Sequence, residues 1–342
     1  MILFLRQLIK NIIDTIIAIQ QNIDTNIHLL LFKYNQVIIG PVKKSSIFLT
    51  IHSRFQTVLI NILKLGPIPE HVSFIMDGNR RYAKSNNLPL KKGHEAGGIR
   101  LLSLLYFCKK VGINCVSTYA FSIENFNRPK NEIDLLIKLF NNKIDEFLKR
   151  SNDISDQLYG ANLKIVGNVK LLSEELQVKI QNLNEKCDNS KEDKSTQFTV
   201  YVCMPYTSRD DIYNTINKTV QTTTDSSTIN VESFTKSMYL KDFSNECDIL
   251  IRTSGHRRLS DYMLWQTHNN SSIYFSKYLW PDFNFFQLFL ILLNWSFFTS
   301  ISRFYSHAMN NDTTISFTKK KGINLNDLPP PPKSISITGS SE

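Results

Sequence analysis

The chain has 342 residues, of which 42% are hydrophobic and 20% are charged, so most of it can bury a hydrophobic core. Its formal net charge of +10 suits an anionic partner, namely a phosphate-bearing substrate, an anionic membrane surface or a nucleic acid, and does not choose among them. The five cysteines form no CxxC pair, which argues against structural zinc and chain-wide disulfides and favours reduced thiols in a cytosol-facing protein.

The N-terminal segment, residues 1–65, is expected to be helical, with an amphipathic helix over 46–65 that ends at Gly66-Pro67. Charged residues interrupt its Ile- and Leu-rich start, so no uncharged run reaches the roughly 18 residues of a membrane-spanning helix. A second apolar stretch, residues 285–298, is also expected to be too short for a span. Both segments suit either a membrane interface or packing on protein, and the sequence leaves these alternatives open.

Between these segments, strands that are apolar nearly throughout alternate with helices. The expected strands are 71–78, 115–122, 162–168, 197–206 and 247–255, and the expected helices are 95–111, 132–150, 173–186 and a helix from about 208. This alternation predicts an α/β fold with a central, mostly parallel sheet flanked by helices. Ligands of such sheets bind beyond the carboxyl ends of the strands, where polar and charged residues follow here.

Three further segments lack apolar periodicity. Residues 188–196 and 221–230 are polar and are predicted to be surface insertions. The tail from about residue 306 contains a run of three lysines, a run of four prolines and a Ser-rich end. This composition predicts a disordered tail.

The first chemically informative cluster, Asp77-Gly78-Asn79-Arg80-Arg81, lies between the first strand and a helical stretch. A helix start offers unpaired backbone N–H groups to a phosphate, and arginine donors match phosphate oxygens. Gly78 lets the backbone approach a ligand closely, and Asp77 suits Mg²⁺, which prefers a carboxylate together with substrate phosphates. The alternative interpretation is a plain Asp-Gly turn with surface arginines.

Two more clusters follow strands. Residues 122–129 provide a hydroxyl, an amide and an arginine, and residues 252–260 place Arg252 and Arg258 around a glycine with Ser260 close by. Each alone is compatible with a solvated basic loop. Three such clusters at the strand ends of one sheet instead predict room for two diphosphate groups.

The sequence lacks the motifs of other common classes of enzyme. The chain contains no Walker A loop, no GxGxxG, no HExxH and no GxSxG. Asp210-Asp211 is not followed by the further Asp of the DDxxD motif that trans-type prenyl synthases use. A nucleic-acid-binding function rests only on the basic charge, and no basic face with interleaved aromatics supports it.

In order and spacing, the blocks of residues 66–305 resemble the cis-prenyltransferases: HVSFIMDGNRRYAK, GHEAGG, YAFSIENFNRPKNE, YTSRDDI, RTSGHRRLSDYMLWQ and LWPDF. The particular forms that these blocks take in this chain are most similar to those of eukaryotic, in particular fungal, dehydrodolichyl diphosphate synthases. This resemblance implies a Mg²⁺-dependent transferase that condenses isopentenyl diphosphate in cis onto farnesyl diphosphate. The long-chain product would grow into an apolar tunnel between the sheet and its helices and would feed dolichol synthesis and protein glycosylation.

The resemblance also implies roles for the matched residues. Asp77 would be the Mg²⁺-linked carboxylate, and Asn125 would assist condensation near the reacting carbons. The residues implied to hold the allylic diphosphate are Gly78, Asn79, Arg80, Arg81, His94, Ser122 and Arg128. Those implied to hold isopentenyl diphosphate are Arg252, Arg258 and Ser260.

Two departures from the family pattern predict a partner. Bacterial homodimeric members carry a metal-binding Glu shortly after the LLWQ block, where residues 267–272 have no carboxylate, and this puts a second protein metal ligand in doubt. They also end in an Arg-x-Gly motif, which residues 339–342 do not offer, so a Nogo-B-receptor-like subunit is expected to supply it. A non-catalytic subunit of the same fold is the alternative function, although such a subunit is expected to lose the clusters at Asp77 and Arg252.

The expected organisation has three parts. Residues 1–65 are expected to form a helical segment that suits association with a membrane. Residues 66–305 are expected to form the catalytic domain, and residues 306–342 the disordered tail. A peripheral position on the cytosolic face of the endoplasmic reticulum membrane is expected, with the lipid droplet as a further location. No nucleic-acid partner is expected.

Overall fold

The computed structural model describes residues 46–188, 198–222 and 229–310. The predictions for residues 1–45, for most of the two polar insertions and for the tail beyond 310 lie outside these described residues. Of the described residues, those up to Ser300 belong to one compact unit, and those from Ile301 belong to a second. The fold below is that of the first unit.

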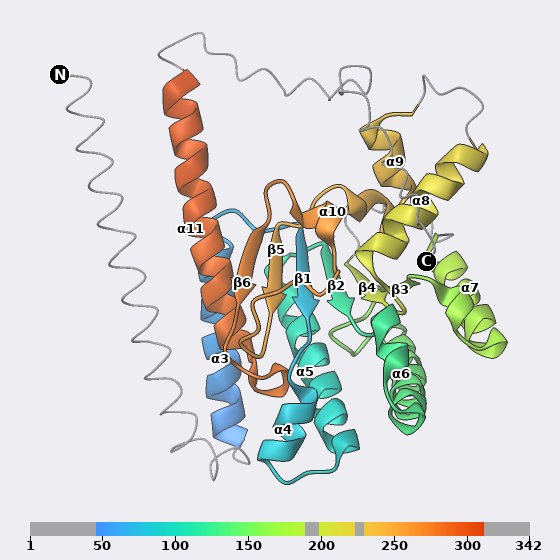
Figure 1. The fold of residues 1–342 in the computed structure, drawn as a ribbon. Helices are drawn as coiled ribbons and strands as arrows, with labels where there is room; N and C mark the ends of the chain where they lie inside the picture. The colour runs from blue at the N-terminus through green and yellow to red at the C-terminus, as the bar shows by residue number, and fades with distance from the viewer. Residues whose placement is uncertain (1–45, 189–197, 223–228, 311–342) are drawn as a thin grey trace, which may run out of the picture. The chain divides into compact units, whose positions relative to one another are not determined.

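A sheet of six parallel strands forms the centre of the described residues, in the order β3-β4-β2-β1-β5-β6 (Figure 1). The strands are β1 (His71–Ile75), β2 (Cys115–Tyr119), β3 (Asn162–Val166), β4 (Thr199–Cys203), β5 (Ile249–Arg252) and β6 (Ser272–Phe275). Every residue of β1 and β4 is buried, as expected of parallel strands that are covered on both faces. The predicted parallel sheet is confirmed, with β6 as a strand that the sequence analysis did not identify.

Adjacent strand residues supply two separate hydrophobic clusters, because successive side chains point to opposite faces of a sheet. Val116 and Ile251 belong to the larger cluster, whereas their neighbours Cys115 and Leu250 belong to the smaller one. The larger cluster is completed by α3 (Ser46–Leu63), α5 (Leu90–Val111), α6 (Lys130–Ser151), α7 (Glu174–Asp188) and α11 (Phe285–Asn310). The smaller cluster includes Tyr262 and residues around the 3-10 helix η4 (Lys241–Ser244).

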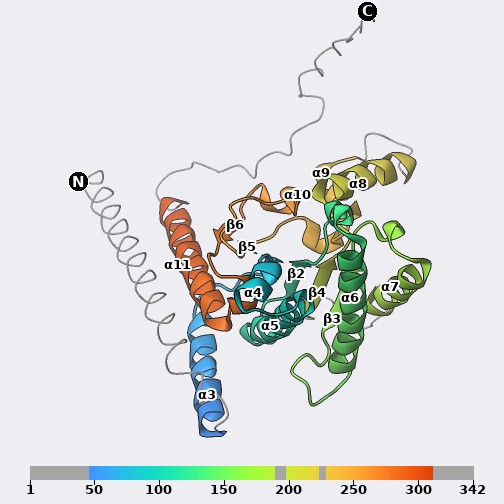
Figure 2. The same cartoon turned by 60° about the horizontal axis from the view of Figure 1, so that its bottom comes forward.

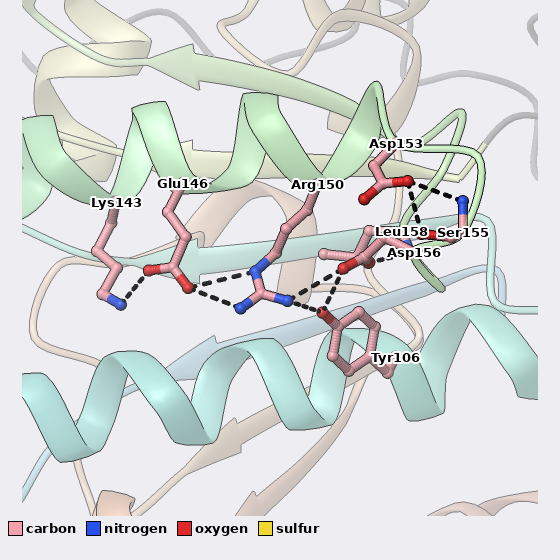
Figure 3. Close-up of polar contacts among 8 residues, drawn as sticks. All are labelled: Tyr106, Lys143, Glu146, Arg150, Asp153, Ser155, Asp156 and Leu158. Carbon is pink, nitrogen blue, oxygen red and sulfur yellow. Dashed lines mark hydrogen bonds and ion pairs between the residues drawn. The ribbon is translucent and has the colours of Figure 1, made fainter.

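Arg150 ties the end of α6 to α5 and to the loop that returns the chain to β3 (Figure 3). Its Nη1 donates to the Tyr106 hydroxyl of α5 at 2.8 Å and to Asp156 Oδ2 at 3.0 Å. Its Nε and Nη2 donate to Glu146 Oε1, one turn earlier, at 3.2 and 3.0 Å. A planar guanidinium holds three partners in this way because its five donors lie in a fixed fork.

The predicted apolar stretch 285–298 is part of a longer helix, since α11 continues to Asn310. The hydroxyl residues that follow position 298 do not end it, because Ser and Thr lower helix propensity only slightly. Within it, residues 285–304 are long and apolar enough to cross a membrane by length and composition alone, which corrects the expectation of too short a stretch. Leu288 and Leu292, however, are at most 1% exposed and pack in the protein core.

A buried carboxyl group lies at the start of α8 (Ser208–Thr222). Asp211 is 0% exposed, and it accepts hydrogen bonds from the Tyr206 hydroxyl at 3.3 Å and from the Tyr239 backbone N–H at 3.0 Å. Burial raises the pKa of Asp211 to about 7, and the hydrogen bonds only partly oppose this rise.

Asp211→Asn is therefore expected to change how stability depends on pH. The folded-state pKa lies above the ordinary value of 3.8, so the native protein binds this proton more tightly than the unfolded chain. The free energy of unfolding of the wild type then falls as the pH rises from about 4 to about 7. The variant carries no titrating group at this position. Its free energy of unfolding, measured relative to that of the wild type, is therefore expected to rise by roughly 2 to 3 kcal/mol from pH 5 to pH 8.

Urea unfolding at the two pH values measures this difference. The exposed Asp134→Asn provides a control for loss of a carboxylate from the surface. If the free energies of unfolding of wild type and variant differ by the same amount at pH 5 and at pH 8, the prediction is contradicted.

Candidate active site

Three residues separate the end of β1 from the start of helix α4 (Asn79–Ser85), and Figure 2 shows this helix with α5 in front of the strands. Between strand and helix, Gly78 adopts φ +116°, a conformation that side chains disfavour. The Tyr82 N–H donates to the Gly78 carbonyl at 2.9 Å, which closes the first helical turn. This turn at Gly78 starts the helix and leaves the Asp77 carboxylate just beyond the end of β1.

The Asp77 backbone is held from two other segments. Its carbonyl accepts hydrogen bonds from Thr253 Oγ1 at 2.7 Å and from the Trp280 N–H at 3.0 Å. Its carboxylate accepts a hydrogen bond from Arg252 Nη2 at 2.9 Å, and its side chain stays 31% exposed. Asp77 is therefore fixed in position but open to a ligand on one side.

The pKa of Asp77 lies below its ordinary value. Burial raises this pKa, but the hydrogen bond and charge of Arg252, with smaller contributions from Ser254 and Arg81, outweigh burial. Asp77 is thus an ionised carboxylate at neutral pH.

Arg252 connects the first predicted cluster with the third. It ends β5, is 4% exposed, and donates through Nη1 to Ser260 Oγ at 2.7 Å and to the Arg258 carbonyl at 2.6 Å, in addition to Asp77. Its Nε is buried and has no partner among the described residues. Because β1 and β5 are paired neighbours, the sheet brings these sequence-distant groups together.

Arg81 adds a second cationic group beside Asp77. Its Nη2 lies 4.0 Å from Asp77 Oδ1 and donates to the Ser254 carbonyl at 3.0 Å and to the Ser254 hydroxyl. About half of the Arg81 side chain is exposed, so it can turn toward a bound anion. Arg258, also predicted here, is exposed and contributes its carbonyl to Arg252.

A second group of charges gathers around Glu132 of α6. Arg128 Nη1 donates to Glu132 Oε1 at 2.9 Å, and Arg80 Nη1 lies 3.9 Å from the same oxygen. His94 lies within electrostatic reach of all three; burial lowers its pKa to about 4, Glu132 opposes this and the two arginines add to it. His94 is therefore neutral at pH 7, and its Nε2 is buried without a partner among the described residues.

Sequence reasoning missed Glu132, which is only 13% exposed at its side chain. The signal was present, because Glu132 follows Arg128 by four residues and such pairs meet at a helix start.

Ser122 and Asn125 serve a local structural role at the end of β2. Ser122 Oγ accepts the Glu124 N–H at 3.1 Å, and Asn125 Oδ1 accepts the Ser122 N–H at 3.2 Å, which caps the 3-10 helix η1 (Ile123–Asn127). The Arg128 N–H in turn donates to the Asn125 carbonyl at 3.1 Å. The cap orients the segment that carries Arg128, while direct substrate contacts by Ser122 and Asn125 stay predictions.

Asn79 lies where α4 packs on α5. Its Oδ1 is buried without a partner among the described residues, and a Cβ on Gly97 would lie 2.3 Å from it. Trp280 closes the same contact, since its Nε1 donates to the Gly97 carbonyl at 2.9 Å. The GHEAGG and LWPDF blocks thus position the segment that contains Asp77 and both arginines of α4.

A magnesium ion fits the donor set at Asp77. No cluster of three or more His, Cys, Asp or Glu side chains suited to a metal exists among the described residues. Asp77 is nevertheless a partly exposed, ionised oxygen donor, which matches Mg²⁺ held by one carboxylate and substrate phosphates.

Comparison with known proteins gives consistent results. Residues 75–300 match the prenyltransferase family described as "Putative undecaprenyl diphosphate synthase". The chain is 50% identical to the dehydrodolichyl diphosphate synthase complex subunit SRT1 of Saccharomyces cerevisiae, over 89% of this chain and 90% of that protein. It is 38% identical to the human complex subunit DHDDS, over 70% of this chain and 71% of that protein.

Among solved structures, lavandulyl diphosphate synthase from Lavandula x intermedia, in complex with dimethylallyl diphosphate, matches with a TM-score of 0.57 and 26% identity. The match covers 67% of this chain and 95% of that one. This likeness confirms the α/β fold; the predicted tunnel stays a prediction.

Proposed function

Because the chain belongs to the undecaprenyl diphosphate synthase-like family of cis-prenyl diphosphate synthases, we propose that it adds isopentenyl diphosphate units in cis to farnesyl diphosphate. The product would be a long-chain dehydrodolichyl diphosphate that feeds dolichol synthesis and protein glycosylation. One observation carries the catalytic assignment: the buried Arg252 joins the ionised Asp77 to Ser260 and to the Arg258 backbone. A subunit without catalytic function has no need for this arrangement of charges.

The cationic side chains of the site would divide between the two substrates. Arg80, Arg81 and Arg128, with the start of α4, would hold the allylic diphosphate, because arginine donors and a helix N-terminus both favour phosphate oxygens. Arg252, Arg258 and Ser260 would hold isopentenyl diphosphate. Neutral His94 would lie close to the diphosphates as a hydrogen-bonding group and not as a charge.

In the condensation, the allylic C–O bond breaks, diphosphate leaves, and the new carbon–carbon bond forms to isopentenyl diphosphate, which then loses a proton. Mg²⁺ bound with Asp77 would neutralise the leaving diphosphate. The arginines would stabilise the same developing charge, and electrostatic stabilisation of this kind is usually the largest single contribution to catalysis. Asn125 would assist near the reacting carbons once its side chain leaves the cap that it forms at Ser122.

A partner subunit is part of the proposal. The yeast and human relatives are both named as subunits of a dehydrodolichyl diphosphate synthase complex. A Nogo-B-receptor-like subunit would supply the Arg-x-Gly group to the site. The complex would lie at the cytosolic face of the endoplasmic reticulum membrane or on lipid droplets, which a water-insoluble product favours.

Incorporation of labelled isopentenyl diphosphate onto farnesyl diphosphate with Mg²⁺ tests this function. We expect long-chain product from the full-length chain with its partner subunit, and a rate lower by about tenfold or more from the chain alone, because the site then lacks a group that contacts the reacting diphosphate. Full activity of the single chain would contradict the partner. A folded chain that forms no product with the partner present would instead favour the non-catalytic subunit.

A further inference from the structure

We propose that Arg209 is a positioning residue for the isopentenyl diphosphate site, to which it contributes no ligand. It would act through Asp261, which it holds in place next to Ser260. The inference rests on the proposed function for the identity of the ligand. It rests on geometry alone for the role of Arg209 in the loop.

The loop from β5 to α10 (Leu264–Thr267) has an unusual backbone. Ser254, Ser260, Asp261 and Met263 have φ values of +80°, +54°, +56° and +50°. Non-glycine residues rarely adopt this left-handed conformation, and they keep it only where the surrounding structure overdetermines it. Some group outside the loop must therefore hold residues 260 and 261.

Arg209 on α8 provides this restraint. Its Nε donates to Asp261 Oδ2 at 2.8 Å, and its backbone N–H donates to Asp261 Oδ1 at 3.2 Å. The neighbouring Ser208 N–H donates to the Asp261 carbonyl at 2.7 Å. The Asp261 side chain is 10% exposed, whereas the Arg209 side chain is 74% exposed, so solvent screens the arginine end of this ion pair and the hydrogen bonds to the buried carboxylate carry the restraint.

Asp261 transmits this restraint to the site through the peptide bond. Ser260 Oγ accepts a hydrogen bond from Arg252 Nη1 at 2.7 Å, and the Ser260 carbonyl accepts one from the Tyr119 hydroxyl at 3.2 Å. A shift at Asp261 therefore moves the hydroxyl proposed to contact the diphosphate. It also disturbs the Arg252 guanidinium that reaches Asp77.

A second ion pair of Arg209 is weaker. Its Nη2 lies 3.3 Å from Glu124 Oε1, but both side chains are more than 60% exposed, and exposed pairs contribute little. Glu124 precedes Asn125 in the segment proposed for the allylic substrate. The inference assigns the effect of Arg209 to Asp261, and Glu124→Gln serves as a matched control.

Two measurements on the form that is active in the assay above, single chain or complex, test the inference. The first is calorimetric titration with isopentenyl diphosphate and Mg²⁺ in the absence of an allylic substrate. The second is hydrogen exchange of the loop amides 254–263, which needs no ligand. We expect Arg209→Ala to weaken isopentenyl diphosphate binding by about tenfold and to speed exchange in this loop.

Three control variants sharpen the result. Arg209→Lys keeps the charge and is expected to restore part of the affinity. Glu124→Gln and Lys236→Ala, which removes an exposed ion pair to Glu232 on α9 (Val231–Ser237), are expected to leave the affinity unchanged. Asp261→Gly adopts the left-handed backbone without strain and removes the acceptor oxygens, and in its background Arg209→Ala should cause no further loss.

The outcomes are separable. Unchanged affinity in Arg209→Ala overturns the inference even if loop exchange rises, because Arg209 would then be a purely structural residue. The inference is also overturned if the losses of isopentenyl diphosphate affinity from Arg209→Ala and from the Asp261 substitution add up in the double variant. If the wild type binds no isopentenyl diphosphate, the proposed function fails, and unchanged loop exchange in Arg209→Ala would overturn the positioning role separately.

Discussion

Asp77→Asn is expected to reduce long-chain product formation by about 10²- to 10³-fold or more, because it removes the one negative charge proposed to share Mg²⁺ with the substrate. The amide has nearly the same shape and keeps an oxygen for the hydrogen bond from Arg252 Nη2. The pKa of Asp77 is lowered, so the wild-type side chain is ionised at neutral pH and the substitution changes its charge. Activity that depends on this charge disappears only when the pH falls through that lowered pKa.

The measurement is labelled isopentenyl diphosphate incorporation under saturating farnesyl diphosphate, with a Mg²⁺ titration for each variant. Asp248→Asn is the matched control, because Asp248 Oδ2 accepts the Glu70 and His71 backbone N–H groups at the opposite ends of β1 and β5. The control variant should lose thermal stability and keep its turnover rate at low temperature. Turnover by Asp77→Asn within a few-fold of wild type would remove Asp77 from the metal site.

The strand ends were the predictable part of this site. Parallel strands with buried residues on both faces leave a clear apolar signal, and their polar ends must converge at one edge of the sheet. The order of the strands could not be predicted from local sequence patterns, because β1 pairs both with β2, the next strand in the sequence, and with the distant β5. The contact of Arg252 with Asp77 depends on this order and crosses 175 positions of sequence. Local patterns therefore located both residues without placing one beside the other.

Other features escaped prediction for local reasons. The edge strand β6 has four residues that alternate between half-buried and exposed, so it lacks the continuous apolar signal of its neighbours. Helix α9 directly follows the polar stretch 221–230, whose last residue, Asn230, caps it: the Asn230 side chain accepts the Ser233 N–H at 2.8 Å. Composition alone describes such a stretch as a loop, because capping residues and loop residues are the same types.

Gly97→Ala is expected to lower product formation by about 10²-fold and to destabilise the fold by roughly 1 to 3 kcal/mol. The added Cβ would lie 2.3 Å from Asn79 Oδ1 and 2.9 Å from Trp280 Cδ1. Trp280 is 1% exposed and donates to the Gly97 carbonyl, so neither it nor the backbone of α5 has room to move. The strain is therefore relieved by displacing Asn79 and the start of α4, which carries the proposed diphosphate ligands.

Gly98→Ala is the matched control on the same helix, one residue later. Its Cβ would meet Lys143 Cε at 3.0 Å, the far end of a flexible side chain that can move aside. Alanine also forms helix better than glycine, so this variant should gain roughly 0.5 to 1 kcal/mol and keep its activity. Thermal unfolding and turnover measured on both variants separate the two effects. Equal behaviour of the two alanines would mean that helix propensity decides the outcome, and that the α4–α5 contact does not set the position of Asp77 and its arginines.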